Sequence, residues 1–174
     1  RSRKMDIQIE KFVTGPIETN TYVVSGETKD CIIIDPCYSS GEIIKYVKDE
    51  KLVPRAIVLT HAHFDHITAI PEIQAVFKDL DVYCHKLDMD FLSKPEYNGS
   101  PMIGKPFSYT GSVRQLEEGP CTIAGLTFTV IHVPGHTPGG CAFLFGNNLI
   151  CGDILFAGSI GRSDFPGGDG ELLI

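Results

Sequence analysis

The chain has 174 residues, 43% of them hydrophobic and 21% charged, which is the composition of one soluble domain; we expect it to span residues 1–174. A formal net charge of −7 and the absence of a lysine or arginine cluster disfavour a nucleic-acid partner, because phosphate binding needs a basic face. No apolar run approaches the roughly 20 residues that span a bilayer, and the N-terminus lacks the apolar stretch of a signal peptide. We therefore expect a cytoplasmic protein without a membrane partner.

The first half of the chain has the patterns of a sheet with helices beside it. Five short apolar runs indicate β-strands, at residues 5–13, 20–26, 31–36, 55–60 and 81–85. The first three predict a meander, whereas the last two are continuously apolar and predict strands covered on both faces. Ser39 and Glu42 match a capping box ahead of a helix that should run to about residue 50, and Pro71 fits the first turn of a helix over 71–77.

The second half is again rich in strand and turn signals. Residues 93–112 are rich in Gly, Pro and Ser without a period, and they predict a long loop of the kind that covers a site. A further strand is expected within 113–119, and hairpin turns are expected at 124–125 and 146–148. Two β-rich halves, each with a helix after its strands, predict an α+β fold in which two sheets pack together with helices outside.

Six cysteines are present at positions 31, 37, 84, 121, 141 and 151. None forms a C-x-x-C pair, and most lie inside apolar, strand-like runs. We interpret them as reduced, buried thiols rather than as disulfides, because a cysteine without a partner packs as a small hydrophobic residue.

Three of the six histidines lie in the segment THAHFDHI at residues 60–67. His61 and His63 are two residues apart at the end of a strand, so their side chains can point to the same side. Asp65 and His66 then enter a turn and can curl back toward the same point. Imidazole nitrogens and a carboxylate are ligands for Zn²⁺, Mn²⁺ or Fe²⁺, so this spacing indicates a metal site rather than a solvated helix cap.

Two distant segments supply further candidate ligands. His136 lies in the loop PGHTPGG, which is too rich in Gly and Pro for a strand or helix, and Asp153 follows an apolar strand. A carboxylate beside a core is seldom left unpaired, and a bridging position between two cations would satisfy both of its oxygens. His132 and His85 are weaker candidates with structural interpretations within strands. Asp35 is expected to hold a histidine or a loop amide rather than to bind metal.

At these motifs the chain resembles the metallo-β-lactamase-fold superfamily, in particular its small glyoxalase II-like (hydroxyacylglutathione hydrolase-like) branch. The segments that carry the resemblance are THAHFDH, PGHTPGG, the GD at 152–153 and LFAGSIGRSDFPGGD at 155–169. The resemblance implies a four-layer αβ/βα sandwich with a site at one edge of the two sheets. It also implies six metal ligands: His61, His63 and His136 on one ion, Asp65 and His66 on a second, and Asp153 between the two.

One departure from the family's pattern concerns the end of the sequence. The family supplies a further histidine to the second metal from a late GHG-like turn, and this sequence has no such residue. Asp169 would cap a helix that reaches only Ile174, and a helix of one turn does not sustain itself in water. We therefore expect the C-terminal strand and helix of the fold to be missing from this chain and the natural polypeptide to continue.

The resemblance implies a metal-dependent hydrolase of small-molecule thioesters or esters. Two divalent ions, zinc by first choice with iron or manganese as alternatives, would share a hydroxide that attacks a carbonyl, and Asp65 would orient it. Thioesters of the hydroxyacylglutathione type are the expected substrates. The G-x-S-x-G pattern of serine hydrolases is absent from the sequence, and no pattern indicates an oligomeric state.

Two other functions remain open at this point. A mononuclear iron persulfide dioxygenase of the same fold would hold its iron with His61, His63 and Asp153, and a non-catalytic module would bind metal without turnover. Four residues could line a substrate pocket, although the aromatic ones among them could equally anchor the loop on the sheet: Tyr97, Phe107, Tyr109 and Arg162.

Overall fold

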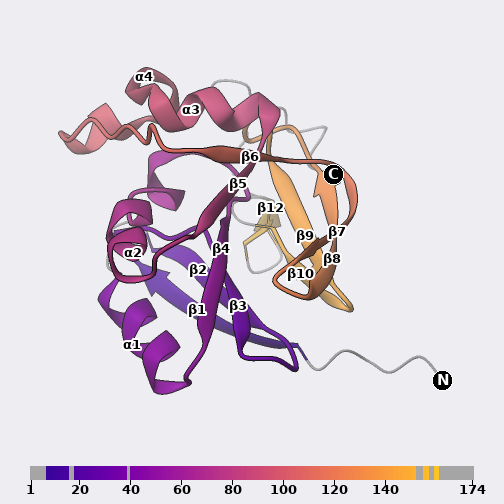
Figure 1. Cartoon of the computed structure of the whole chain (residues 1–174). Coiled ribbons are helices and arrows are strands. Elements are labelled where there is room, and N and C mark those ends of the chain that lie inside the picture. Colours follow the sequence, from indigo (N-terminus) through magenta and orange to yellow (C-terminus); the bar gives the residue numbers. More distant parts are fainter. Residues whose placement is uncertain (1–6, 16–17, 39, 152–154, 157–158, 161–174) are drawn as a thin grey trace.

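The computed structural model describes residues 7–15, 18–38, 40–151, 155–156 and 159–160. Two sheets pack face to face, and helices cover the outer face of the larger one (Figure 1). The larger sheet has the order β1 (Gln8–Thr14), β2 (Thr19–Ser25), β3 (Asp30–Ile34), β4 (Val53–Val58), β5 (Asp81–His85) and β6 (Val113–Leu116). The smaller has the order β10 (Asn148–Ile150), β9 (Cys141–Phe145), β8 (Leu126–His132) and β7 (Gly119–Ile123). A separate pair is formed by β11 (Leu155–Phe156) and β12 (Ser159–Ile160).

The larger sheet changes from antiparallel to parallel pairing along its width. Strands β1, β2 and β3 form an antiparallel meander, as the sequence predicts, whereas β3, β4, β5 and β6 run parallel to one another. The carboxyl ends of these parallel strands therefore meet at one edge of the sheet. Segments that leave β3, β4 and β5 at this edge can reach one another, and ligand sites of parallel sheets form at such an edge.

Strand β3 shows how the two hydrophobic cores are built. Cys31 to Ile34 are fully buried, and alternate residues belong to different cores because successive side chains of a strand point to opposite faces. Cys31 and Ile33 pack in the core under the helices, whereas Ile32 and Ile34 pack in the core between the two sheets. Each buried isoleucine contributes about 1.5–3 kcal/mol relative to an exposed one.

Helices α1 (Gly41–Asp49) and α2 (Ile70–Val76) cover the outer face of the larger sheet (Figure 1). Pro71 lies in the first turn of α2, as expected. The start of α1 differs from the capping-box prediction: the N-cap is Ser40, and its hydroxyl bonds to the carboxylate of Glu72 instead of to the helix backbone. The Glu72 carboxylate on α2 therefore takes the hydroxyl of Ser40, which leaves the start of α1 without a side-chain cap. Ser39, the residue predicted as the cap, lies outside the described residues.

The segment predicted as one long loop contains short helical turns. Helices α3 (Met89–Ser93) and α4 (Pro95–Asn98) are followed by the 3₁₀ turn η3 (Ser100–Ile103). The buried Asn98 side chain donates hydrogen bonds to the carbonyls of Phe91 (2.8 Å) and Phe107 (2.9 Å). Such side-chain to backbone bonds and glycines with positive φ hold these turns. Neither feature produces a hydrophobic period, so the helical turns leave no signal in the sequence.

The described residues also agree with the prediction for the cysteines. All six cysteines lie in this part of the chain, none forms a disulfide, and four of them are buried. Burial raises the pKa of the Cys31, Cys37 and Cys141 thiols to about 12, so these thiols stay protonated at neutral pH. None of the helices described is long and apolar enough to cross a membrane.

Candidate metal centre

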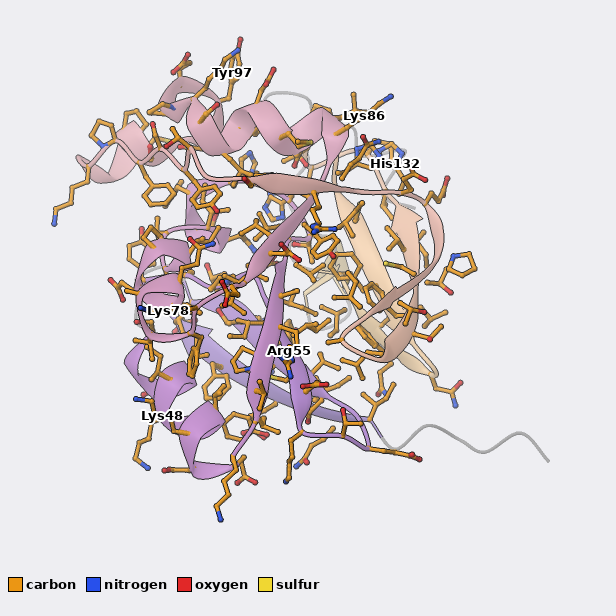
Figure 2. All side chains as sticks on the ribbon, viewed as in Figure 1. Lys48, Arg55, Lys78, Lys86, Tyr97 and His132 are labelled. Atoms are coloured by element: carbon orange, nitrogen blue, oxygen red, sulfur yellow. The ribbon has the colours of Figure 1, made fainter. Side chains whose placement is uncertain are left out.

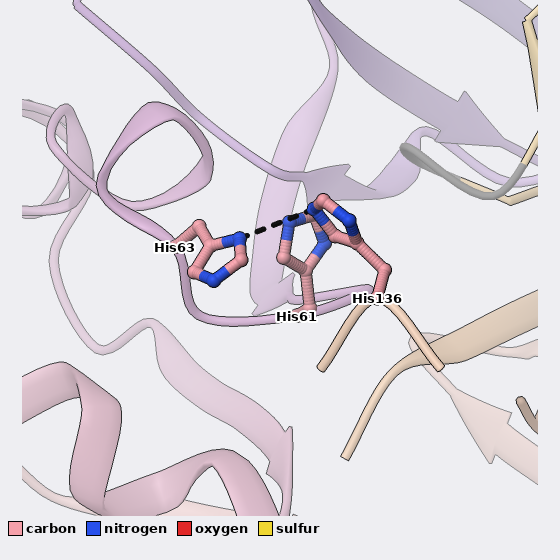
Figure 3. Close-up of side chains that lie close together, drawn as sticks. All are labelled: His61, His63 and His136. Carbon is pink, nitrogen blue, oxygen red and sulfur yellow. Dashed lines mark hydrogen bonds between the residues drawn. The ribbon is translucent and has the colours of Figure 1, made fainter. Parts of the chain in front are cut away.

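Three histidines from two distant segments meet at the edge where the parallel strands end (Figure 3). His61 and His63 follow β4, and His136 lies in the loop between β8 and β9. Their side chains are 3%, 8% and 4% exposed, so the cluster lies below the surface. We call these residues the three-histidine group. Their candidate ligand nitrogens all lie within 4.8 Å of one another.

The spacing within the three-histidine group fits one bound ion. Nδ1 of His63 lies 3.2 Å from Nε2 of His136, the contact drawn as a dashed line in Figure 3. Two ligands of a tetrahedral ion, each bonded at about 2.1 Å, lie about 3.4 Å apart. The rings of His61 and His63 and of His61 and His136 meet edge to face, at centroid distances of 5.0 and 4.9 Å. The three rings thus surround one point rather than stack.

A second pair of candidate ligands lies in the 3₁₀ turn η1 (Phe64–His66). Oδ2 of Asp65 lies 3.2 Å from Nε2 of His66, again close to the separation expected for two ligands of one ion. We call Asp65 and His66 the Asp-His pair. It adjoins the three-histidine group, because the rings of His61 and His66 have centroids only 4.0 Å apart. Thr19 donates a hydrogen bond to Oδ2 of Asp65 (3.2 Å), which fixes that carboxylate from β2.

Asp35 sets the proton positions on two of these histidines. Its fully buried carboxylate accepts from Nδ1 of His66 (2.8 Å), from the Thr60 backbone N–H (2.8 Å) and from the Thr60 hydroxyl. The Thr60 hydroxyl has one hydrogen, which it gives to Asp35, so it accepts from Nδ1 of His61 at 3.1 Å. Both rings therefore carry hydrogen on Nδ1 and present the Nε2 lone pair to the site.

The position of Asp35 is itself held by the backbone. Its φ of 55° is in the left-handed region, which an aspartate tolerates better than most residues. The Thr21 hydroxyl donates to the Asp35 carbonyl (2.7 Å), and the Asp35 N–H donates to the Val58 carbonyl (3.3 Å). The supporting role expected for Asp35 is thus what the structure shows, with a histidine and a loop amide as its partners.

Burial keeps His63 in the form that binds metal. Burial first, and then the neighbouring His61 and His136 rings, lower the pKa of His63 to about 2. A neutral imidazole retains a lone pair, whereas a protonated one has none. His63 is therefore a neutral donor throughout the physiological range of pH, as a metal ligand must be.

The remaining histidines lie outside the cluster. His85 and His132 stack on each other, with ring centroids 4.2 Å apart and an angle of 12° between the planes. Nε2 of His132 lies 2.9 Å from the Pro138 carbonyl, and Nδ1 of His85 accepts from the Leu87 N–H. The interpretation of both as structural residues fits these contacts. Asp153, Arg162 and Asp169 lie outside the described residues.

The aromatic residues of the 93–112 segment divide into anchors and an exposed ring. Phe107 and Tyr109 pack against the core under the helices, as anchors would. Tyr97 is 50% exposed and points away from the body of the molecule (Figure 2). Phe91 links the two environments, because its ring centroid lies 6.1 Å from that of His63 and 5.7 Å from that of Tyr97. A row of aromatic rings therefore leads outward from the three-histidine group.

Sequence reasoning missed three residues that support the cluster: Thr19, Thr60 and Asp88. Thr19 and Thr60 hold Asp65 and His61, and a threonine next to a ligand motif carries no distinctive signal. Asp88 is fully buried in the 3₁₀ turn η2 (Lys86–Asp88), directly after β5. An acid placed shortly after a buried parallel strand, at the same edge as the candidate ligands, was the available signal.

Comparison with known proteins gives one family and several close relatives. The model of the metallo-beta-lactamase superfamily matches residues 14–174. A probable metallo-hydrolase, YqgX of Bacillus subtilis (strain 168), is 36% identical over 168 residues, which cover 94% of this chain and 79% of the relative. The hydroxyacylglutathione hydrolase GloC of Haemophilus influenzae is 28% identical over 180 residues, covering 97% of this chain and 81% of the relative.

Two solved structures are similar over nearly the whole chain. BLEG-1, described as a B3 metallo-beta-lactamase, has a TM-score of 0.88 and 39% identity, with 95% of this chain and 81% of that chain covered. TTHA1623, solved in a di-iron-bound form, has a TM-score of 0.81 and 37% identity, with 94% and 81% covered. The similar proteins thus share the fold, while their names differ in activity and metal.

Proposed function

Because the chain belongs to the metallo-beta-lactamase superfamily, whose relatives include metallo-hydrolases, we propose that it is a metal-dependent hydrolase of small thioesters of the hydroxyacylglutathione type. The observation that carries the proposal is the convergence of His61, His63 and His136 beside the Asp-His pair. Two ligand pairs at 3.2 Å and lone pairs directed inward fit divalent cations.

The proposed ligand sets follow from this geometry. The three-histidine group would hold one ion, and Asp65 with His66 would hold a second; Asp153, outside the described residues, is proposed as the carboxylate shared between them. Zinc suits these nitrogen and oxygen donors, and iron suits them as well, as the di-iron form of TTHA1623 illustrates for that protein.

Divalent ions bound here would supply a water activated at neutral pH and a positive field for a carbonyl oxygen. The protein's own residues position the reactants. The Asp65 carboxylate, held by the Thr19 hydroxyl, would accept a hydrogen bond from the attacking water and orient it. Asp35 keeps the His61 and His66 rings fixed, so the site does not reorganise when charge develops on the substrate.

The substrate side of the site is proposed to be the aromatic row on α3 and α4. Phe91 packs beside His63, and Tyr97 continues the row, with the Lys94 ammonium 5.2 Å from the Tyr97 ring centroid. An apolar wall that ends at a cation suits a thioester whose thiol portion carries carboxylates. This chemistry supports a glutathione-like leaving group and is less suited to a bare acyl ester.

The test separates the candidate activities by metal and by substrate. Full-length protein loaded with Zn²⁺ is assayed under nitrogen with a panel of hydroxyacyl thioesters, and Fe²⁺-loaded protein is assayed for oxygen uptake with a persulfide. We expect thioester cleavage without oxygen and a loss of about 10²-fold or more in rate for Asp65→Asn, as for other groups that orient a catalytic water. His132→Gln, which changes a histidine outside the cluster, should retain activity.

Three outcomes would contradict the proposal. Oxygen uptake without thioester cleavage would favour the persulfide dioxygenase. Cleavage of a β-lactam in preference to every thioester would favour the activity in the description of BLEG-1. Stoichiometric metal binding with no turnover of any of these substrates would leave a non-catalytic metal-binding module.

A further inference from the structure

Asp88 is a fully buried carboxylate that lies in neither ligand set. It ends the turn η2 after β5, and its side chain is 0% exposed. Among the described residues no lysine or arginine forms an ion pair with it, so its partners are hydrogen-bond donors. A buried carboxylate without such partners is strongly unfavourable, so the donors that face it identify what it holds.

The donors to Asp88 come from both segments that carry the three-histidine group. Oδ2 accepts from the backbone N–H of Ala62 (3.2 Å), the residue between His61 and His63. The same oxygen accepts from the hydroxyl of Thr137 (2.7 Å), the residue after His136. This one carboxylate oxygen is therefore bonded both to the residue between His61 and His63 and to the residue after His136.

The other oxygen binds the same loop a second time. Oδ1 accepts from the backbone N–H of Gly139 at 2.7 Å. A Cβ atom added at Gly139 would lie 2.8 Å from that oxygen and 2.7 Å from the Asp88 backbone nitrogen, closer than real Cβ contacts. The glycine of the PGHTPGG loop thus allows the loop to approach Asp88 closely enough to form both bonds.

These bonds matter because the two segments belong to different sheets. His63 and His136 are 73 residues apart in sequence, and their ligand nitrogens must stay about 3 Å apart to share an ion. Within one sheet, ladder hydrogen bonds would fix such a distance. Between the sheets a backbone bond joins Cys141 N to Thr60 O (2.8 Å). Asp88 adds a side-chain bridge, with one hydrogen bond to the His61–His63 segment and two to the His136 loop.

We infer that Asp88 is a positioning residue for the three-histidine group: it holds the His61–His63 segment and the His136 loop at the separation that one ion requires. The bonds of Asp88 go to the segments that carry the three histidines. The ring of His66 and the carboxylate of Asp65 are held by Asp35 and Thr19. The role is therefore specific to one of the two ligand sets. It depends on the metal centre but not on the identity of the substrate.

The test measures metal binding, not turnover. Asp88→Asn keeps the size of the side chain but replaces one acceptor oxygen with a donor. Competitive titration of the full chain with Zn²⁺ and a chelating dye gives the affinity for each equivalent, and nitrogen NMR of the histidine rings shows which histidines each equivalent shifts. We expect the equivalent that shifts His63 and His136 to bind 10- to 100-fold more weakly, as is typical when a residue that supports a ligand is lost. The equivalent that shifts His66 should change less than threefold.

Matched variants separate positioning from general loss of stability. Thr137→Val removes one donor to Asp88 at nearly constant volume and should weaken the same equivalent about two- to tenfold, while Thr137→Ser, which restores the hydroxyl, should recover wild-type affinity. Asp90→Asn changes an exposed acid of the neighbouring helix and should have no effect. Urea unfolding of each metal-free variant shows that the titrations are made on folded protein.

The inference is overturned if Asp88→Asn binds the Zn²⁺ equivalent that shifts His63 and His136 as tightly as the wild type does. It is also overturned if both equivalents weaken equally. Failure of Thr137→Ser to recover affinity would also overturn it. A wild-type protein that binds no divalent ion would overturn the metal centre itself. Loss of thioesterase activity alone would bear only on the proposed function.

Discussion

The three-histidine group and the Asp-His pair are built in opposite ways. Asp65 and His66 are neighbours in one 3₁₀ turn, so the local chain already brings them together. The three-histidine group is assembled across two sheets, and it keeps its geometry only while those sheets stay in register. The two proposed ion sites therefore have different weak points: side-chain orientation in the pair, and the separation of two segments in the group.

The largest effect is expected where the two sets meet. His61 lies against His63, His136 and His66, so its loss damages both sets. We expect His61→Ala to lower turnover by about 10³-fold or more, because the ions supply several kcal/mol of charge stabilisation at about 1.4 kcal/mol per tenfold in rate. Elemental analysis should show fewer than one ion per chain. Two retained ions with normal turnover would show that the sets do not depend on His61.

A smaller effect, on metal affinity at both ligand sets, is expected for Asp35→Asn. Asparagine tolerates the left-handed φ of 55°, so the backbone should hold, but the amide cannot accept from both Thr60 and His66. Since His61 and His66 both depend on Asp35, both equivalents should bind about 10- to 100-fold more weakly. The same titration used for Asp88→Asn measures this. A selective effect on one equivalent would show that Asp35 does not serve both sets.

The smallest effect concerns the stability of the metal-free protein in mild acid. The folded state holds the pKa of His63 at about 2, whereas in the unfolded chain it lies near 6.5. Below pH 6.5 the unfolded state therefore binds a proton that the folded state does not, so the free energy of unfolding falls as pH falls. This one group accounts for about 2 kcal/mol between pH 6.5 and 5, at about 1.4 kcal/mol per pH unit.

Urea unfolding at a series of pH values measures this slope, and His63→Gln should reduce it. The slope arises from His63, which the rings of His61 and His136 crowd, so His132→Gln should leave it unchanged. An identical slope in His63→Gln and the wild type would assign the acid sensitivity to other residues.

Much of the fold could be predicted from the sequence because its signals are local. The meander, the buried strands β4 and β5 and the hairpin at Ala124–Gly125 follow from alternation, apolar runs and turn residues, and both turn residues have positive φ. The superfamily and its fold, which the motifs indicated, are confirmed by the family model and by the solved structures. The helical turns of residues 93–112 were not predicted, because side-chain to backbone bonds hold them without any period.

The residues of the candidate site also differ in whether a local sequence signal marks them. His61 and His63 could be predicted from a spacing of two at a strand end, and His136 from a histidine in a glycine-rich loop. The position of Asp88 after a buried strand was a signal, but its contacts could not be predicted, because its partners Thr137 and Gly139 lie 49 and 51 residues away in the sequence. The metal roles of the six ligands, Asp153 among them, stay predictions that the titrations above test.

The arrangement of β3 to β6 has a consequence for how such a protein can diversify. These strands are buried between two cores, while the segments that carry Asp35, His61 to His66 and Asp88 leave from one edge of their sheet. Insertions or exchanges in the stretch from α3 to η3 can therefore reshape what enters the site without touching a packed strand. In a scaffold of this kind, the residues that stabilise the fold are different from those that select the substrate. Directed evolution of new specificities should therefore concentrate its changes on the segments at that edge.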